Sequence, residues 1–199
     1  MQRFQVEHAL RAAQEITGEK EFVVIGSCSV LGTYPKKGEV LTKETEEVDL
    51  YPRYHPEMSN LLNAIGRYST FSETHGFWVD PVGPETSKLP EEWEKRLVKL
   101  SNENTSFAVG WCLDVHDVAV AKLVAGREKD MIFIKDLVAH GLADFKIILE
   151  RLDQIPNLDP ETRKLRGEML DQAVKHMKST QESPSQSKSH NDKGCKSKE

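Results

Sequence analysis

The stretch Glu46-Glu47-Val48-Asp49-Leu50-Tyr51, closed by Pro52, alternates acidic and apolar side chains. Side chains two positions apart on a β-strand point to the same face of the sheet. Glu47 and Asp49 would therefore share one face, while Val48 and Leu50 would share the other. We predict a strand with one acidic face and one buried face, and the rest of the fold is worked outward from it.

Two explanations fit the acidic pair. Neighbouring carboxylates repel each other unless a cation lies between them, and Mg²⁺ prefers oxygen ligands of this kind. The pair therefore fits a metal-binding strand. It also fits an edge strand whose acidic face is solvated, where the repulsion costs little.

A turn precedes this strand and bears on the choice. Residues 21–25 are short, apolar and β-branched, which predicts a strand buried on both faces. They end at Gly26-Ser27, and residues 28–31 are expected to begin a short helix. A glycine lets the backbone approach a ligand closely, and the amides at a helix start attract anions. Gly26 and Ser27 thus predict a phosphate-binding turn, although Gly-Ser also marks ordinary turns.

Composition limits the class of protein. The chain has 199 residues, a formal net charge of -5 and 38% hydrophobic residues, which is enough for one ordinary domain. Its mild acidity argues against wholesale coating of nucleic acid. Three widely spaced cysteines (Cys28, Cys112 and Cys195) make a disulfide framework or a structural zinc site unexpected. No apolar run could cross a membrane and no secretory signal is seen, so we expect a cytoplasmic location.

Hydrophobic spacing and turn residues predict the remaining elements. Helices are expected over residues 6–16, 57–66, 115–124, 130–140, 144–152 and 160–177, strands over 77–80, 96–100 and 107–111, an exposed loop over 32–44, and an irregular connection over 82–92. This order predicts an α+β (mixed α/β) fold in which helices flank a small mixed central sheet. Residues 1–142 would form the main domain, with a helical section over 143–178 packed on it. Residues 179–199 are polar and are expected to be disordered.

Several short motifs carry a family resemblance. They are Gly26-Ser27, Thr45-Glu46-Glu47-Val48-Asp49-Leu50-Tyr51-Pro52, Gly83-Pro84-Glu85-Thr86, Asp117 with Lys122-Leu123, and Arg127-Glu128-Lys129-Asp130. Over about residues 20–142 the chain resembles the nucleotidyltransferase superfamily with the polymerase-beta-like fold. More narrowly, it resembles a family of uncharacterised bacterial nucleotidyltransferase-like proteins related to toxin-type nucleotidyltransferases. Thr45 stands where that family usually has Ser, and the hydroxyl is kept.

The resemblance implies a metal site and a nucleotide site. Glu47 and Asp49 would bind Mg²⁺ or Mn²⁺, and Gly26 and Ser27 would hold the phosphates of an NTP. The superfamily has a third carboxylate on a neighbouring strand, for which Asp80 is the candidate, both as metal ligand and as catalytic base. Asp80 also fits a simple strand-end turn residue ahead of Pro81, and Glu85 is a weaker substitute.

Lys122 and Asp130 are the remaining candidates for nucleotide binding. A helical lysine and a later aspartate accompany activity in related toxin-type enzymes, so Lys122 is assigned to the triphosphate by resemblance. The alternatives are an ion-paired surface helix for Lys122 and an N-cap for Asp130. Cys28 is expected to be a buried residue rather than a nucleophile, and the three tryptophans are expected to be core or cap residues.

The function implied is Mg²⁺-dependent transfer of a nucleoside monophosphate from an NTP to an RNA end or a protein hydroxyl. A toxin–antitoxin or defence context, with an antitoxin as partner, follows from the resemblance alone. The alternative is a non-catalytic binding or regulatory module with the same fold. A nucleotide sensor that binds without turnover is a third reading.

Overall fold

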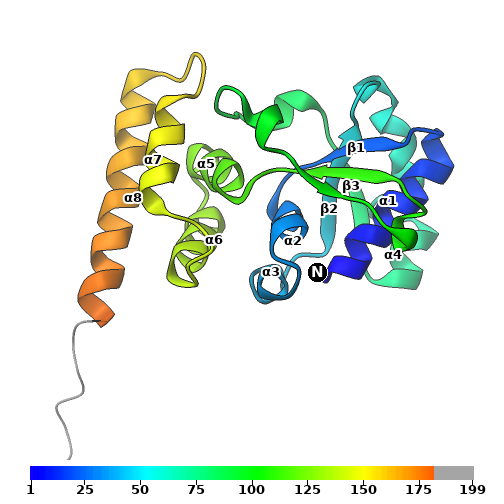
Figure 1. Cartoon of the computed structure of the whole chain (residues 1–199), viewed down its shortest axis with the longest axis horizontal. Helices are drawn as coiled ribbons and strands as arrows, with labels where there is room; N and C mark the ends of the chain where they lie inside the picture. The colour runs from blue at the N-terminus through cyan, green and yellow to red at the C-terminus, as the bar shows by residue number, and fades with distance from the viewer. Residues whose placement is uncertain (182–199) are drawn as a thin grey trace, which may run out of the picture.

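The computed structural model describes residues 1–181, with side chains up to His176. Its centre is one five-stranded sheet in the order β3-β2-β1-β5-β4, in the right half of Figure 1. The strands are β1 (Glu21–Val24), β2 (Glu47–Pro52), β3 (Trp78–Pro81), β4 (Val98–Leu100) and β5 (Val109–Cys112). β1 is antiparallel to β2 and parallel to β5, while β2 and β3 are parallel. The predicted α+β class with a mixed sheet is confirmed.

One face of the sheet is packed under α1 (Arg3–Thr17). Leu10 of this helix lies against Val24 and Val48 in a buried cluster, and so close to Gly110 that a Cβ there would lie 2.6 Å from Leu10 Cδ1. α1 ends at Gly18, which adopts the left-handed conformation with φ 75° that glycine tolerates best. The apolar face predicted for β2 is therefore its core face.

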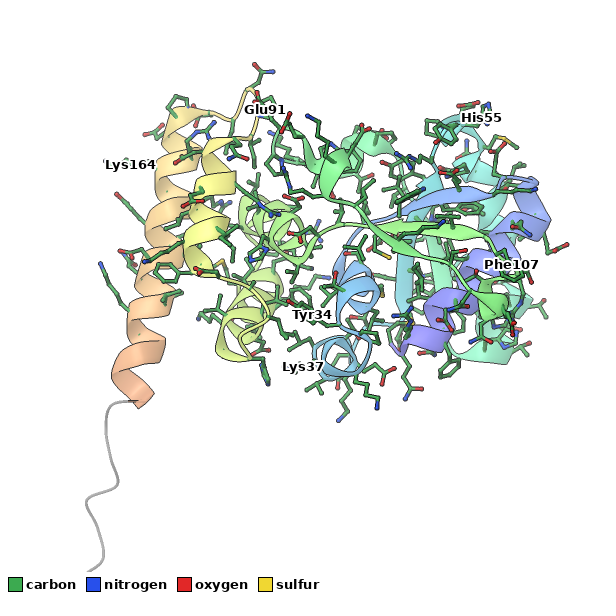
Figure 2. All side chains as sticks on the ribbon, viewed as in Figure 1. Tyr34, Lys37, His55, Glu91, Phe107 and Lys164 are labelled. Carbon is green, nitrogen blue, oxygen red and sulfur yellow. The ribbon has the colours of Figure 1, made fainter. Side chains whose placement is uncertain are left out.

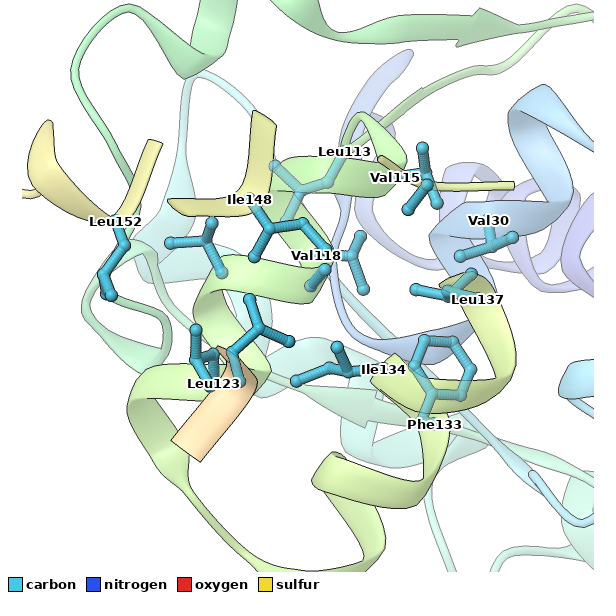
Figure 3. Packing of buried hydrophobic residues seen from close by; sticks show 14 of the residues in the cluster. Val30, Leu113, Val115, Val118, Leu123, Phe133, Ile134, Leu137, Ile148 and Leu152 are labelled. Carbon is cyan, nitrogen blue, oxygen red and sulfur yellow. The ribbon is translucent and has the colours of Figure 1, made fainter. Parts of the chain in front are cut away.

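The opposite face carries the acidic side of β2 and meets a helical section. Val23 and Tyr51 of the sheet contribute to a second buried cluster, whose helical part is shown in Figure 3. The helices are α5 (Val115–Ala125), α6 (Glu128–Ala139), α7 (Phe145–Asp153) and α8 (Pro160–Gln181). They occupy the left half of Figure 1, so the molecule has a sheet part and a helical part side by side.

A buried ion-pair network joins the two parts. Asp117 of α5 is fully buried, and Arg96, just ahead of β4, donates to both its carboxylate oxygens at 2.9 and 3.0 Å. Arg151 of α7 donates to the same carboxylate at 2.9 Å and also to Asp114, the N-cap of α5. Removing one partner of a buried pair costs about 3–5 kcal/mol. The network therefore fixes α5 against both the sheet and α7.

The predicted loop over residues 32–44 was wrong. The chain forms α2 (Val30–Thr33) and then α3 (Pro35–Leu41), with Gly38 and Thr42 buried. Pro35 is tolerated because it occupies the first turn of the helix, where its missing N–H is not needed. Gly38 is closely packed, because a Cβ there would lie 3.1 Å from Leu31 Cδ2.

Other elements differ in type or length. Residues Pro56–Ile65 form a 3-10 segment instead of an α-helix, and α4 (Thr70–His75) was not predicted. The strand predicted over 96–100 is shorter because Trp93–Arg96 is a 3-10 turn, and the strand predicted over 107–111 is shifted to Val109–Cys112. α8 runs to Gln181, beyond the predicted end, and residues 182–199 with Cys195 lie outside the described part. The division at residues 142 and 178 stays a prediction.

Within the described residues, every helix is too short or too polar to span a bilayer.

Candidate active site

A cavity of about 1210 Å³ lies between the acidic face of the sheet and the helical section. Its walls come from the Gly26-Ser27 turn, β2, β3, α5, α6 and the segment ahead of α8. Figure 2 shows α3, which carries Lys37 and follows Tyr34, beside α6. All seven site residues predicted from the sequence line the cavity: Gly26, Ser27, Glu47, Asp49, Asp80, Lys122 and Asp130.

The parallel pairing of β2 and β3 places the three carboxylates on one face of the sheet. Glu47 is in register with Trp78, and Asp49 with Asp80. Residues in register on adjacent strands point to the same face of the sheet. Asp80 is exposed at the cavity, whereas Glu47 and Asp49 are half-buried. The predicted third carboxylate thus lies beside the acidic pair, and Glu85, which is also exposed, lines the cavity.

Gly26 is held against Asp49. Its backbone has φ 67° and ψ -164°, a region that is essentially restricted to glycine. A Cβ on Gly26 would lie 1.9 Å from Oδ2 of Asp49. The backbone also joins the two strands here, because the Ile25 N–H donates to the Asp49 carbonyl at 2.9 Å. Gly26 therefore makes room for the carboxylate and bends the chain away from it.

The turn after Gly26 is a single 3-10 turn, Ser27–Ser29, that continues into α2. The Ser29 hydroxyl donates to the Gly26 carbonyl at 2.7 Å, and the fully buried Cys28 thiol donates to the Glu47 carbonyl at 3.0 Å. Burial raises the pKa of Cys28, which confirms it as a packed residue and not a nucleophile. The Ser27 hydroxyl bonds to no described residue, so it is available to a ligand.

Asp49 is the most perturbed acid of the site. Burial, together with the neighbouring carboxylates of Glu47 and Asp80, raises its pKa from 3.8 to about 7. Lys122 and Lys129, across the cavity, act in the opposite direction. Because repulsion outweighs this attraction, the acidic cluster is short of positive charge. Such perturbation in a cavity is typical of functional sites.

Lys122 and Asp130 form an ion pair on the helical wall. Nζ of Lys122 lies 2.9 Å from Oδ1 of Asp130, and 4.8 Å from the centre of the Phe133 ring. Asp130 is 3% exposed, and its other oxygen has no hydrogen-bond partner, with Nε of Arg127 at 3.9 Å. Asp130 is not the N-cap of α6, which is Arg127. Both residues face the cavity, while their role towards a nucleotide stays a prediction.

The acidic residues fit a metal that shares its coordination with a substrate. No three His, Cys, Asp or Glu side chains among residues 1–176 are gathered closely enough to hold a metal ion by themselves. Mg²⁺, however, is usually held by one or two carboxylates together with substrate phosphates, and not by an all-protein cage. The half-buried pair Glu47 and Asp49, which lacks compensating charge, supplies hard oxygens of that kind.

A second group at the cavity was not predicted from the sequence. Arg67 and Trp78 both line it, and the Arg67 guanidinium lies 5.1 Å from the centre of the Trp78 ring. Trp78 is partly exposed, so of the two expected roles, core or cap, it does not have the first. Arg67 and Trp78 are separated by α4, and only the unpredicted path of this segment brings them together. The outward alternation of Trp78 with Asp80 on β3 was the one usable signal.

Comparison with known proteins identifies a family. Residues 3–181 match the family described as "Nucleotidyltransferase of unknown function (DUF6036)". This match covers most of the chain, so the protein belongs to that family. No curated protein and no solved structure matches it.

Proposed function

We propose, since the chain belongs to a nucleotidyltransferase family, that it transfers a nucleoside monophosphate from an NTP to a hydroxyl group in a Mg²⁺-dependent reaction. The acceptor is an RNA end or a protein hydroxyl. One observation carries the proposal: Asp49, in register with Asp80 and pressed against Gly26, has a pKa raised by burial and by two neighbouring carboxylates. A site with this excess of negative charge gains most by binding a cation.

The residues proposed to bind the metal and the phosphates lie on both walls of the cavity. Glu47 and Asp49 hold the metal, which when bound offsets charge on the phosphates and on the reacting oxygens. The free hydroxyl of Ser27 and the backbone of Gly26 contact the phosphates from the sheet side. Lys122 and Lys129 contact them from the helical side, where they already face Asp49.

The transfer itself needs one proton acceptor. Asp80 takes the proton from the acceptor hydroxyl, and the resulting oxygen attacks the α-phosphorus of the NTP. The bond from the α-phosphorus to the oxygen bridging to the β-phosphate breaks, and pyrophosphate leaves. Reactions of this kind are accelerated chiefly by positioning and by charge stabilisation. Asp80 suits the role because it is exposed beside the metal-binding pair.

A label-transfer assay tests the proposal. The protein is incubated with Mg²⁺ or Mn²⁺ and each α-labelled NTP, with total RNA and with cell protein as acceptors. Asp49→Asn should reduce transfer about 100-fold or more. Glu73→Gln, which alters an exposed acid of α4 outside the cavity, should leave it unchanged. NTP binding without transfer in every acceptor panel would instead support the nucleotide sensor, and no NTP binding at all would support the non-catalytic module.

The toxin–antitoxin or defence role and the antitoxin partner rest on the resemblance alone, and the cytoplasmic location rests on the sequence features given above. All three therefore stay predictions.

A further inference from the structure

Arg67 and Trp78 line the cavity, and Tyr68, which does not line it, joins them in an aromatic and cationic group through Arg67. The Arg67 guanidinium lies 5.1 Å from the centre of the Trp78 ring and 5.4 Å from that of Tyr68. Tyr68 is 86% exposed and has a φ of 69°, which is uncommon for a residue with a side chain. The group therefore presents flat apolar surface and a positive charge to solvent.

A second group of the same composition shows what is unusual about the first. Arg53 lies 4.7 Å from the centre of the Trp111 ring and 5.4 Å from that of Tyr54, in the segment that leads to His55, labelled in Figure 2. The hydrogen-bond donors of that group already have a partner within the protein. Glu21 accepts a hydrogen bond from the Trp111 indole at 2.6 Å and one from Arg53 at 3.3 Å. It needs no ligand, and it does not line the cavity.

The first group has no such partner. Among the described residues, none accepts a hydrogen bond from the Arg67 guanidinium or from the indole N–H of Trp78. Arg67 is exposed, so these donors face solvent at the cavity. An arginine stacked on an aromatic ring with its donors unused suits a ligand that has a flat face and an anionic group.

The group is also placed next to the proposed base. Trp78 and Asp80 are two residues apart on β3, so their side chains share a face and their Cα atoms are about 6.6 Å apart. A base stacked at Trp78 brings its own sugar hydroxyl towards Asp80. The cavity, at about 1210 Å³, exceeds the usual 300–1,000 Å³ of small-molecule sites, so it has room beyond one nucleotide.

We propose that Arg67, Tyr68 and Trp78 bind the acceptor of the reaction, and that this acceptor is the unpaired, hydroxyl-bearing end of a single-stranded nucleic acid. This inference rests on the proposed function and selects the nucleic acid over the protein hydroxyl. The terminal base stacks on Trp78, and Arg67 binds the adjacent phosphate. Stacking on aromatic rings combined with arginine contacts is the usual way of binding single strands.

The test measures acceptor binding without chemistry. A short fluorescein-labelled oligoribonucleotide is titrated with the protein in EDTA, without NTP, at physiological salt, and its anisotropy is recorded. Trp78→Ala should weaken binding about 5-fold to 150-fold, and Trp78→Phe should restore most of it. Arg67→Ala, at an exposed position that folding does not require, should weaken binding about 5-fold or more. The matched control, Arg53→Ala, should change it less than about 2-fold.

Two further arms identify the acceptor. An oligodeoxyribonucleotide of the same sequence distinguishes RNA from DNA, and either one supports the inference if its binding depends on Arg67 and Trp78. A serine-containing peptide tests the other class. Peptide binding that Arg67→Ala abolishes, or oligonucleotide binding unaffected by Arg67→Ala, would overturn the inference.

The outcome is separable from that of the proposed function. If the oligonucleotide binds through Arg67 and Trp78 but no label is transferred, the proposed function fails and the acceptor site stands. If label is transferred to protein and Arg67→Ala has no effect on transfer or on oligonucleotide binding, the transferase stands and the acceptor site fails.

Discussion

Gly26 and Asp49 are packed so closely that a β-carbon on Gly26 would overlap the Asp49 carboxylate, at 1.9 Å from Oδ2. The turn and the acidic strand are consequently one structural unit, although they are separated by some twenty residues in the sequence. The carboxylate can occupy its position only because residue 26 has no side chain.

Gly26→Ala should therefore reduce nucleotidyl transfer about 100-fold, because a shift of about 1 Å at a catalytic group can have that effect. It should also lower the melting temperature by several degrees, since the φ of 67° is strained for alanine. Transfer assays and thermal unfolding measure the two effects.

Gly76→Ala is the matched control for this variant. Gly76 has nearly the same φ, 69°, but nothing lies within 4 Å of its would-be Cβ. The control should lose stability and keep its activity. Full activity in Gly26→Ala would show that nucleotidyl transfer does not depend on the exact position of the Asp49 carboxylate.

Asp49→Asn should stabilise the metal-free protein at about pH 8. The pKa of Asp49 is about 7 in the folded state and near 3.9 when unfolded. Between these values the folded state holds a proton that the unfolded state has lost, so the free energy of unfolding falls as the pH rises from about 4 to about 7. At about 1.4 kcal/mol per pKa unit, the ionised carboxylate costs at most about 4 kcal/mol.

Urea unfolding in EDTA at a series of pH values measures this difference. The free energy of unfolding of Asp49→Asn should exceed that of the wild type most near pH 8, and the difference should decrease steadily towards pH 5. Glu73→Gln, at an exposed site, should follow the wild type at every pH. Equal stability of Asp49→Asn and wild type at pH 8 would show that nearby positive charge already offsets the Asp49 carboxylate.

Mg²⁺ with a non-hydrolysable NTP analogue should raise the melting temperature of the wild type by several degrees at saturating concentration. The increase should be greater at about pH 8 than at pH 6, because Asp49 must release its proton to bind the metal. Differential scanning fluorimetry gives the measurement. A shift of the same size in Asp49→Asn would remove Asp49 from the metal site.

Lys122→Met should destabilise the protein by about 3–5 kcal/mol, because it leaves the buried Asp130 carboxylate without its ion-pair partner. The double variant Lys122→Met with Asp130→Asn should recover most of this stability. If Lys122 contacts the triphosphate, the double variant stays impaired in NTP binding. Equilibrium dialysis with labelled NTP decides the point, since recovery of both properties would assign the pair a purely structural role.

The acidic strand could be predicted from the sequence because its alternation has the period of a strand, and nothing in the tertiary structure opposes it. The proximity of Asp80 was harder to predict. It depends on β3 pairing parallel to β2, which the resemblance implied but local sequence did not determine. The roles of these residues still await the experiments above.

Other features of the structure could not be predicted from the sequence, for physical reasons. The helix α3 has Pro35, Gly38 and lysines, which are typical of a loop, and it forms because Gly38 and Thr42 pack into the interior. The stacking of Arg67 on Trp78 arises from long-range chain path, for which local periodicity carries no signal. The Asp117 network likewise joins Arg96 and Arg151 across 55 residues.

That network has a consequence for any attempt to shorten the protein. A fragment ending at residue 142 would lack Arg151, leaving Asp114 and Asp117 with an unbalanced negative charge inside the molecule. It would also uncover apolar side chains of α5 that Ile148 and Leu152 now shield. We therefore expect minimal versions of this protein to need α7.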